Sequence, residues 1–208
     1  MKTIFFIFTL FIVSFVNSQD SIIQYYNEIA YRSEFVTNGK PTIRPPKKWK
    51  TDVKIFVMGT KDSVTYNELL KVVDELNELI NPIEIKIVNE KSQANLIAFF
   101  GLCGEYDKIE PQVVRFSGYN YGLACIFSDE NNDYSHGSFY VDVVRCDWLP
   151  PEEAVMLKKH IVREELTQSL GLMNDSMKYP NSIFYEGWSM TTEFTNMDKE
   201  IIKLHYNK

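Results

Sequence analysis

Five polar side chains towards the C-terminal end of the chain have types and a spacing that could do chemistry. They lie in the stretch R-E-E-L-T-Q-S-L-G-L-M-N-D-S. On a helix, residues four apart share a face, so Glu164 and Gln168 project together, with Glu165 one step round. Asn174 and Asp175 follow a glycine that can turn the chain. The oxygens of this group could bind a hard cation or a polar ligand, and Glu165 could act as a general base.

The same spacing occurs in zinc peptidases, where H-E-x-x-H on a helix places two imidazoles on the metal and a glutamate beside the bound water. Here the motif reads E-E-x-x-Q, with Glu165 at the position of the base. The likeness extends to the metzincin peptidases, whose helix continues x-x-G-x-x-H. Gly171 occupies that turn, and Asn174 stands where the third histidine would be. Zinc prefers imidazole and thiolate, which Glu164, Gln168 and Asn174 do not supply, so we expect no zinc and no other cofactor, with a hard cation as the alternative.

Other segments also resemble metzincins. The segment Y-P-N-S-I-F-Y is similar to the Met-turn of those enzymes, with Phe184 in place of the methionine. Residues 195–198, leading to L-H-Y at 204–206, resemble their closing helix. The stretch 93–100 is similar to their A-D-I-x-I-x-F strand. The resemblance implies a zincin-like fold with the polar residues on its active-site helix.

A closer likeness exists to a domain family of unknown function found mainly in bacterial exported proteins and lipoproteins. Its pattern E-x-L-x-Q-x-L-G-L-x-N-D-S is present here, followed by P-N-S-I-F and a late aspartate and tyrosine. Residues 29–35 and Trp49 resemble its N-terminal pattern. This resemblance covers most of the chain and implies no particular substrate.

The polar helix also has a purely structural interpretation. Gln168 and Asn174 could pair with each other or with backbone groups, and Glu164 and Glu165 could be solvated or paired with Arg163. Buried polar groups are usually satisfied locally in this way. This interpretation predicts that the helix face is covered by other residues.

The histidines add one further candidate. His160 lies four residues before Glu164, so the two could share a helical face as ligands, although a single helix histidine is usually packed or solvated. We expect His136 in a polar loop between two strands, exposed to solvent. His205 lies near the C-terminus.

The elements that position these residues follow from hydrophobic periodicity. Alternating or continuous apolar runs predict strands over residues 53–58, 83–88, 95–100, 123–127 and 138–144. Helical spacing predicts helices over 65–80 and 152–170, with Gly171 as a left-handed cap. A short helix is expected near residues 195–206, and the stretch 101–121 reads as loop. We predict an α/β, zincin-like α+β fold: a mixed, mostly parallel sheet, a long active-site-type helix and an irregular C-terminal subdomain.

The chain begins with the features of a secretory signal. A basic start at Lys2 precedes an apolar run over residues 3–16, and small residues before position 19 suit cleavage. The run is too short for a membrane anchor. We therefore expect a signal peptide at 1–18, an N-terminal helix and extended lead-in at 19–50, and a metzincin-like domain at 51–208. The mature protein is expected to be secreted, with no membrane attachment.

The charge of the chain and its cysteines give further expectations about its partners and its disulfides. The 208-residue chain has a formal net charge of −6 and no Lys/Arg cluster, which argues against nucleic acid. An oxidising compartment would allow one disulfide among Cys103, Cys125 and Cys146, with the pairing left open. Asn174 begins an N-glycosylation sequon. We expect a monomer.

These observations leave three functional hypotheses. The first is a secreted, metzincin-like protein without zinc-binding histidines that binds an extracellular peptide, glycan or protein partner. The second is a peptidase-like hydrolase that uses Glu165 with a non-standard metal site. The third is a structural extracellular domain.

Overall fold

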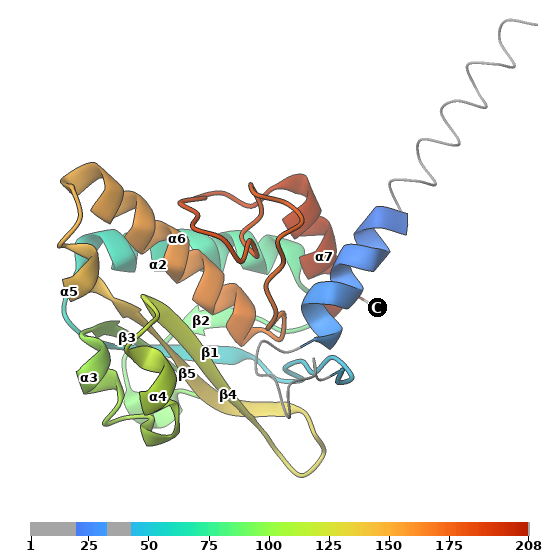
Figure 1. The fold of residues 1–208 in the computed structure, drawn as a ribbon. Coiled ribbons are helices and arrows are strands. Elements are labelled where there is room, and N and C mark those ends of the chain that lie inside the picture. The colour runs from blue at the N-terminus through green and yellow to red at the C-terminus, as the bar shows by residue number, and fades with distance from the viewer. Residues whose placement is uncertain (1–19, 33–42, 208) are drawn as a thin grey trace, which may run out of the picture.

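The computed structural model describes residues 20–32 and 43–207 (Figure 1). The predicted signal peptide lies outside these residues. The predicted N-terminal helix is present over residues 20–31, and Tyr25 and Ile29 bury its inner face. Within the described part of the chain, no helix is both long enough and apolar enough to cross a bilayer.

Five strands form one sheet in the order β2-β1-β3-β5-β4. Their bounds are β1 (Val53–Gly59), β2 (Ile85–Ile87), β3 (Leu96–Gly101), β4 (Gly122–Ser128) and β5 (Tyr134–Asp142). Neighbouring strands are parallel except for the hairpin of β4 and β5, which makes β4 an antiparallel edge strand. The mixed, mostly parallel sheet predicted from the sequence is therefore confirmed.

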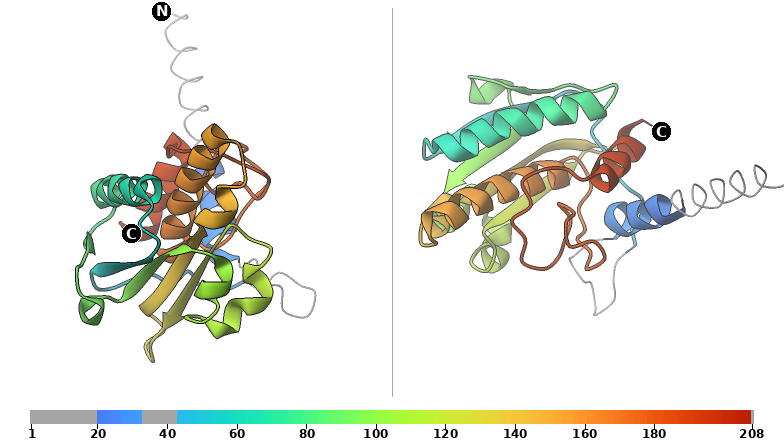
Figure 2. Two further views of the ribbon diagram at one scale, coloured as in Figure 1. Left: turned by 90° about the vertical axis from the view of Figure 1, so that its left-hand side faces the viewer. Right: turned by 90° about the horizontal axis from the view of Figure 1, so that it is seen from above.

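Helices cover both faces of this sheet. Their bounds are α2 (Ser63–Leu79), α3 (Cys103–Tyr106), α4 (Val114–Ser117), α5 (Val143–Cys146), α6 (Pro151–Ser169) and α7 (Asn196–Tyr206), with 3-10 turns at Lys91–Gln93 and Pro111–Val113. Figures 1 and 2 show α2, α6 and α7 on one face and the short helices α3 and α4 on the other. The long helix predicted from the sequence is α6, and the irregular C-terminal segment runs between α6 and α7.

The second face carries a small hydrophobic core that the sequence did not reveal. It consists of Phe99, Tyr106, Val113, Leu123 and Tyr140, packed under α3 and α4. The stretch 101–121, predicted as loop, therefore contains short helical segments. Helices of four residues are too short to show a helical period, which explains the wrong prediction.

The second strand of the hairpin also differs from its predicted bounds. His136, expected in an exposed loop, lies within β5 opposite Phe127, with ring centroids 4.9 Å apart. β5 ends at Asp142 because the Asp142 carboxylate accepts the N–H of Arg145, which caps α5. The polar residues at the start of β5 lack the apolar pattern from which the strands were predicted, so the predicted strand began too late.

The predicted disulfide is absent, since all three cysteines are free thiols. Cys103 and Cys125 pack against the small core, whereas Cys146 is buried in the main core on the other face of the sheet. Burial raises the pKa of the Cys146 thiol to about 12. Each cysteine behaves as a small hydrophobic residue.

The C-terminal end of α6 is held by long-range hydrogen bonds. Gly171 has a φ of +115°, as the predicted left-handed cap requires. The indole N–H of Trp49 donates to the Ser169 carbonyl (2.8 Å), and the Tyr206 hydroxyl donates to the Leu170 carbonyl (2.8 Å). These bonds satisfy carbonyls that a helix end leaves without partners.

A buried ion-pair network joins α6 to α2. The Arg163 guanidinium is fully buried and contacts Glu68 at 2.7 Å and Glu75 at 2.5 Å. It also lies over the ring of Phe194, 4.4 Å from the centroid. The two carboxylates raise the pKa of Arg163 against the opposing effect of burial. The network fixes how the two helices face each other.

We predict that Arg163→Met lowers the free energy of unfolding by about 3–5 kcal/mol, because it leaves two carboxylates at the α2–α6 interface without their cation. Urea unfolding followed by circular dichroism measures the change. Lys203→Met is the matched control, because Lys203 pairs with the exposed Glu200 outside this network and its loss should cost about 1 kcal/mol or less. Equal effects of the two substitutions would contradict this role of Arg163.

Candidate functional site

A cavity of about 320 Å³ opens beside α6 and contains most of the predicted site residues. Helix α6 contributes Leu157, His160, Ile161, Glu164, Glu165 and Gln168 to its wall. The loop before β4 and the start of that strand contribute Tyr119, Asn120, Tyr121, Gly122 and Leu123. The irregular C-terminal segment contributes Asp175, Tyr185, Glu186, Gly187, Trp188 and Ser189. The polar face of α6 therefore lines a cavity, although His160, Glu165 and Gln168 are themselves almost fully buried.

Helical spacing explains which α6 side chains reach the cavity. His160, Glu164 and Gln168 succeed one another at intervals of four and form one stripe. Arg163 and Leu166 lie on a different face and are fully buried. The pairing of Arg163 with α2 thus turns the polar stripe toward the cavity.

His160 and Glu164 form a pair within this stripe. The His160 ring is 5% exposed, and its Nδ1 lies 2.9 Å from the Thr191 carbonyl. Because a carbonyl only accepts, Nδ1 carries the donated proton. The other ring nitrogen, Nε2, lies 3.4 Å from Glu164 Oε2. Burial lowers the pKa of His160, so the ring is mainly neutral at pH 7 and directs the Nε2 lone pair toward the carboxyl group.

Gln168 and Asp175 form a second pair. The Gln168 side-chain amide donates to Asp175 Oδ1 at 3.0 Å. Asn174, expected beside them, is not part of the cavity wall, and its amide donates to the Asp175 carbonyl at 2.6 Å. Gln168 therefore does not pair with Asn174, whose amide has instead the backbone partner that the structural interpretation also allowed.

Glu165 lies in the wall next to the start of β4. Its side chain is 5% exposed. A Cβ added to Gly122 would lie 2.6 Å from Glu165 Oε1 and 2.3 Å from Ile161 Cγ2. Burial is the main cause of the raised pKa of the nearby Tyr140 hydroxyl, and the charge of Glu165 raises it further. Only a residue without a side chain lets β4 approach α6 this closely.

The cavity wall is acidic and aromatic. It includes four carboxylate side chains, Glu164, Glu165, Asp175 and Glu186, and its lining has no lysine or arginine. Four aromatic side chains share the wall: Tyr119, Tyr121, Tyr185 and Trp188. Tyr119 is 86% exposed and Trp188 is 62% exposed. Sequence reasoning missed Glu186 and Trp188, because an irregular segment has no period that could place them.

Phe184, the predicted Met-turn equivalent, lies behind the cavity. It is fully buried in the main core, and its carbonyl accepts the N–H of Ser176 at 2.8 Å. Ser176 and Tyr185 form an isolated parallel bridge next to this bond. The contact joins the turn after α6 to the segment that carries Tyr185 and Trp188.

The donor set does not fit zinc. Within residues 20–32 and 43–207, no group of three or more His, Cys, Asp or Glu side chains is arranged to hold a metal ion. Gln168 already donates its amide to Asp175, and the single imidazole in the wall lies eight residues before Gln168, at His160. Binding of a hard cation by these residues stays a prediction.

Solved structures show the fold class. A crystal structure of myroilysin matches 78% of this chain and 86% of its own, with a TM-score of 0.50 and 11% identity. A second myroilysin structure has a TM-score of 0.48 at 12% identity and covers 77% and 82% of the two chains. The structure of archaemetzincin from Methanopyrus kandleri has a TM-score of 0.45 at 10% identity, and the match covers 76% of this chain and 96% of that chain. The protein has a zincin-like fold.

The family follows from the sequence match. The family described as "Protein of unknown function (DUF2927)" matches residues 19–208, and the chain belongs to it. No curated protein matches the chain. The expected family of unknown function and the expected zincin-like fold are thus confirmed, whereas the specific motif and the metzincin likeness stay predictions.

We predict that Gly122→Ala lowers the free energy of unfolding by about 1–3 kcal/mol, because the added methyl group meets Ile161 and Glu165 in a packed contact. Gly104→Ala is the matched control, since nothing lies within 4 Å of its added Cβ. Chemical denaturation of both variants measures the difference. Equal stability of the two variants would show that β4 and α6 are not in close contact.

Proposed function

We propose that this protein is an exported, metzincin-like binding protein that holds a peptide segment of an extracellular partner in the cavity beside α6 without cleaving it. The apolar run at residues 3–16 supports export. One observation carries the binding role: the helix face that resembles a zinc-peptidase site lines a cavity, yet it lacks the imidazoles that would hold zinc.

The chemistry of the wall favours a basic peptide over a glycan or an acidic ligand. Four carboxylates without a lysine or arginine in the lining attract a cation. The exposed ring of Trp188 offers an aromatic face to a guanidinium or ammonium group, whereas the Tyr121 ring already has the Arg145 guanidinium 4.3 Å from its centroid. An arginine or lysine side chain therefore suits the cavity best.

The adjacent edge of the sheet supports a peptide as the ligand. β4 is an edge strand and begins at Gly122, on the cavity wall. An extended peptide can add to such an edge through backbone hydrogen bonds while one side chain enters the neighbouring cavity. The main chain would supply affinity, and the acidic wall would select the side chain.

We predict that the mature protein binds acetyl-Ala-Ala-Arg-Ala-Ala-amide at least tenfold more tightly than the same peptide with glutamate in place of arginine. Calorimetry measures binding, and the change in tryptophan fluorescence follows it. Glu164→Gln combined with Glu186→Gln should abolish the preference, because it removes two of the four carboxylates. Glu130→Gln, in the exposed loop between β4 and β5, is the control and should leave the preference unchanged.

Two results would contradict this proposal. Equal affinity for the arginine and glutamate peptides would remove the charge selection. Stoichiometric zinc in the purified protein, together with peptidase activity that a chelator abolishes, would remove the non-catalytic role.

A second candidate function is hydrolysis with Glu165 as general base. The observation that favours it is the pair of His160 and Glu164, next to Glu165 on α6, in which a mainly neutral imidazole faces a carboxyl group. Such a pair can hold a proton beside the cavity.

On this second candidate, Glu165→Gln abolishes turnover of a peptide and glycan substrate panel by the purified protein, because the amide cannot accept a proton. His160→Gln should lower turnover and shift its pH profile. Turnover that both substitutions leave unchanged, or no turnover by the unmodified protein, would eliminate hydrolysis at this site.

A further inference from the structure

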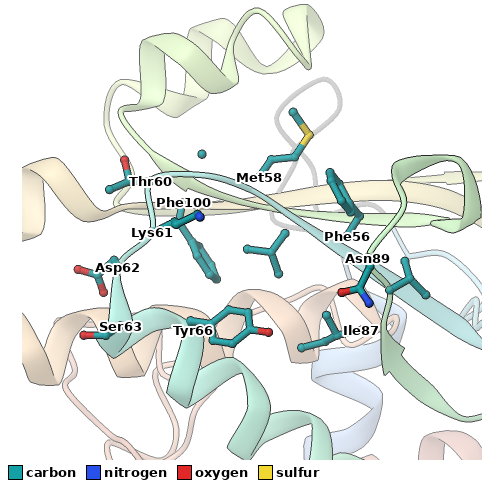
Figure 3. A pocket seen from close by; sticks show the side chains of 13 residues that line it. Phe56, Met58, Thr60, Lys61, Asp62, Ser63, Tyr66, Ile87, Asn89 and Phe100 are labelled. Atoms are coloured by element: carbon teal, nitrogen blue, oxygen red, sulfur yellow. The ribbon is translucent and has the colours of Figure 1, made fainter.

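A second cavity lies at the other end of the sheet, beside β1 (Figure 3). Its volume is about 700 Å³. β1 and β4 are separated by two strands in the sheet, so this cavity is distinct from the acidic one beside α6.

The cavity lies where β2 stops and β1 continues. The two strands are in register only from Val53 to Ile55, and the Val88 N–H donates to the Ile55 carbonyl at 2.8 Å as β2 ends. β1 extends to Gly59 and pairs with β3 over that length on its other side. One edge of β1 is therefore open beyond Ile55.

The backbone of Val57 faces this open edge. In a strand, the N–H and C=O of alternate residues point to the same side. Val53 donates its N–H to the Glu84 carbonyl at 2.9 Å and Ile55 accepts from Val88, so odd-numbered residues of β1 point toward the β2 side. Val57 is the next in this series, and it lines the cavity.

The cavity lies in line with the sheet rather than above it. Met58 packs toward the small core on one face, whereas Phe100 belongs to the main core on the other. Figure 3 shows Phe56 and Met58 on one side of the β1 ribbon, and Phe100 and Tyr66 on the opposite side. A further strand placed here would meet apolar groups on both faces, as a strand inside a sheet does.

The charge at this edge is positive. Lys61 and Asp62 are the charged residues in the cavity wall. Asp62 is already paired with the buried Lys158 at 2.7 Å. Among the described residues, Lys61 has no ion-pair partner, so its ammonium group is the one uncompensated charge of the wall.

We propose that an extended segment of a partner protein adds to β1 as a strand at Val57, with apolar side chains against Met58 and Tyr66 and an acidic side chain at Lys61. Backbone hydrogen bonds to Val57 would supply affinity, and alternate side chains would supply selectivity. The occupant is a peptide strand because the wall presents a strand edge, and an acidic one because the wall carries an unpaired lysine.

The test uses the mature chain and the synthetic peptide acetyl-Thr-Val-Glu-Val-Thr-Val-amide, labelled with fluorescein. Anisotropy should show saturable binding, and hydrogen exchange should show slower exchange of the Val57 amide in the complex. The same peptide with N-methylated valines should bind at least tenfold more weakly, because it lacks the required donors.

A charge exchange tests selectivity. Lys61→Glu should weaken binding of the glutamate peptide and strengthen binding of the version with lysine at that position, each at least fivefold. Lys108→Glu, at an exposed position outside the cavity wall, is the matched control and should change neither affinity.

Three results would overturn the proposal. The first is no binding of either peptide with unchanged exchange at Val57. The second is equal binding of the N-methylated peptide, which would exclude backbone pairing. The third is protection of Val57 that depends on protein concentration alone, which would assign this edge to a second copy of the chain.

Discussion

The buried guanidinium of Arg163 is the contact on which the arrangement of this protein depends. A charge removed from water needs partners, and Glu68 and Glu75 of α2 provide them at the helix interface. Because Arg163 faces α2, the stripe of His160, Glu164 and Gln168 faces the cavity instead. One ion-pair network therefore packs two helices and sets the direction of the polar face.

A second network holds the irregular C-terminal segment that completes the cavity. Asp198 is fully buried and accepts hydrogen bonds from the Ser182 hydroxyl at 2.5 Å and from the Thr195 hydroxyl at 2.7 Å. Tyr25 of the N-terminal helix donates to the same serine at 2.8 Å. Burial raises the pKa of Asp198 despite these donors. Segments without regular hydrogen bonding thus acquire fixed positions through side-chain partners.

The two ends of the sheet offer different surfaces. At β4, acidic and aromatic side chains surround a cavity next to an antiparallel edge. At β1, the early end of β2 leaves a strand edge between apolar residues and one lysine. Both surfaces arise where the sheet stops, because an edge strand keeps backbone groups that no neighbour pairs. The wall at β4 is acidic, whereas the wall at β1 carries Lys61 without an ion-pair partner among the described residues.

Periodicity in the sequence was enough to find the five strands, α2 and α6, because each buries a repeating apolar pattern. It also placed Glu164, Glu165 and Gln168 on one helix. The sequence did not predict α3 and α4, or the course of β5 through His136, because short or polar elements carry no clear period. The separation of the three cysteines was likewise visible only in the tertiary structure. Glu186 and Trp188 reach the cavity only through folding of the irregular segment. Local spacing determines which side chains share a helix face, but packing between distant segments decides whether that face is open.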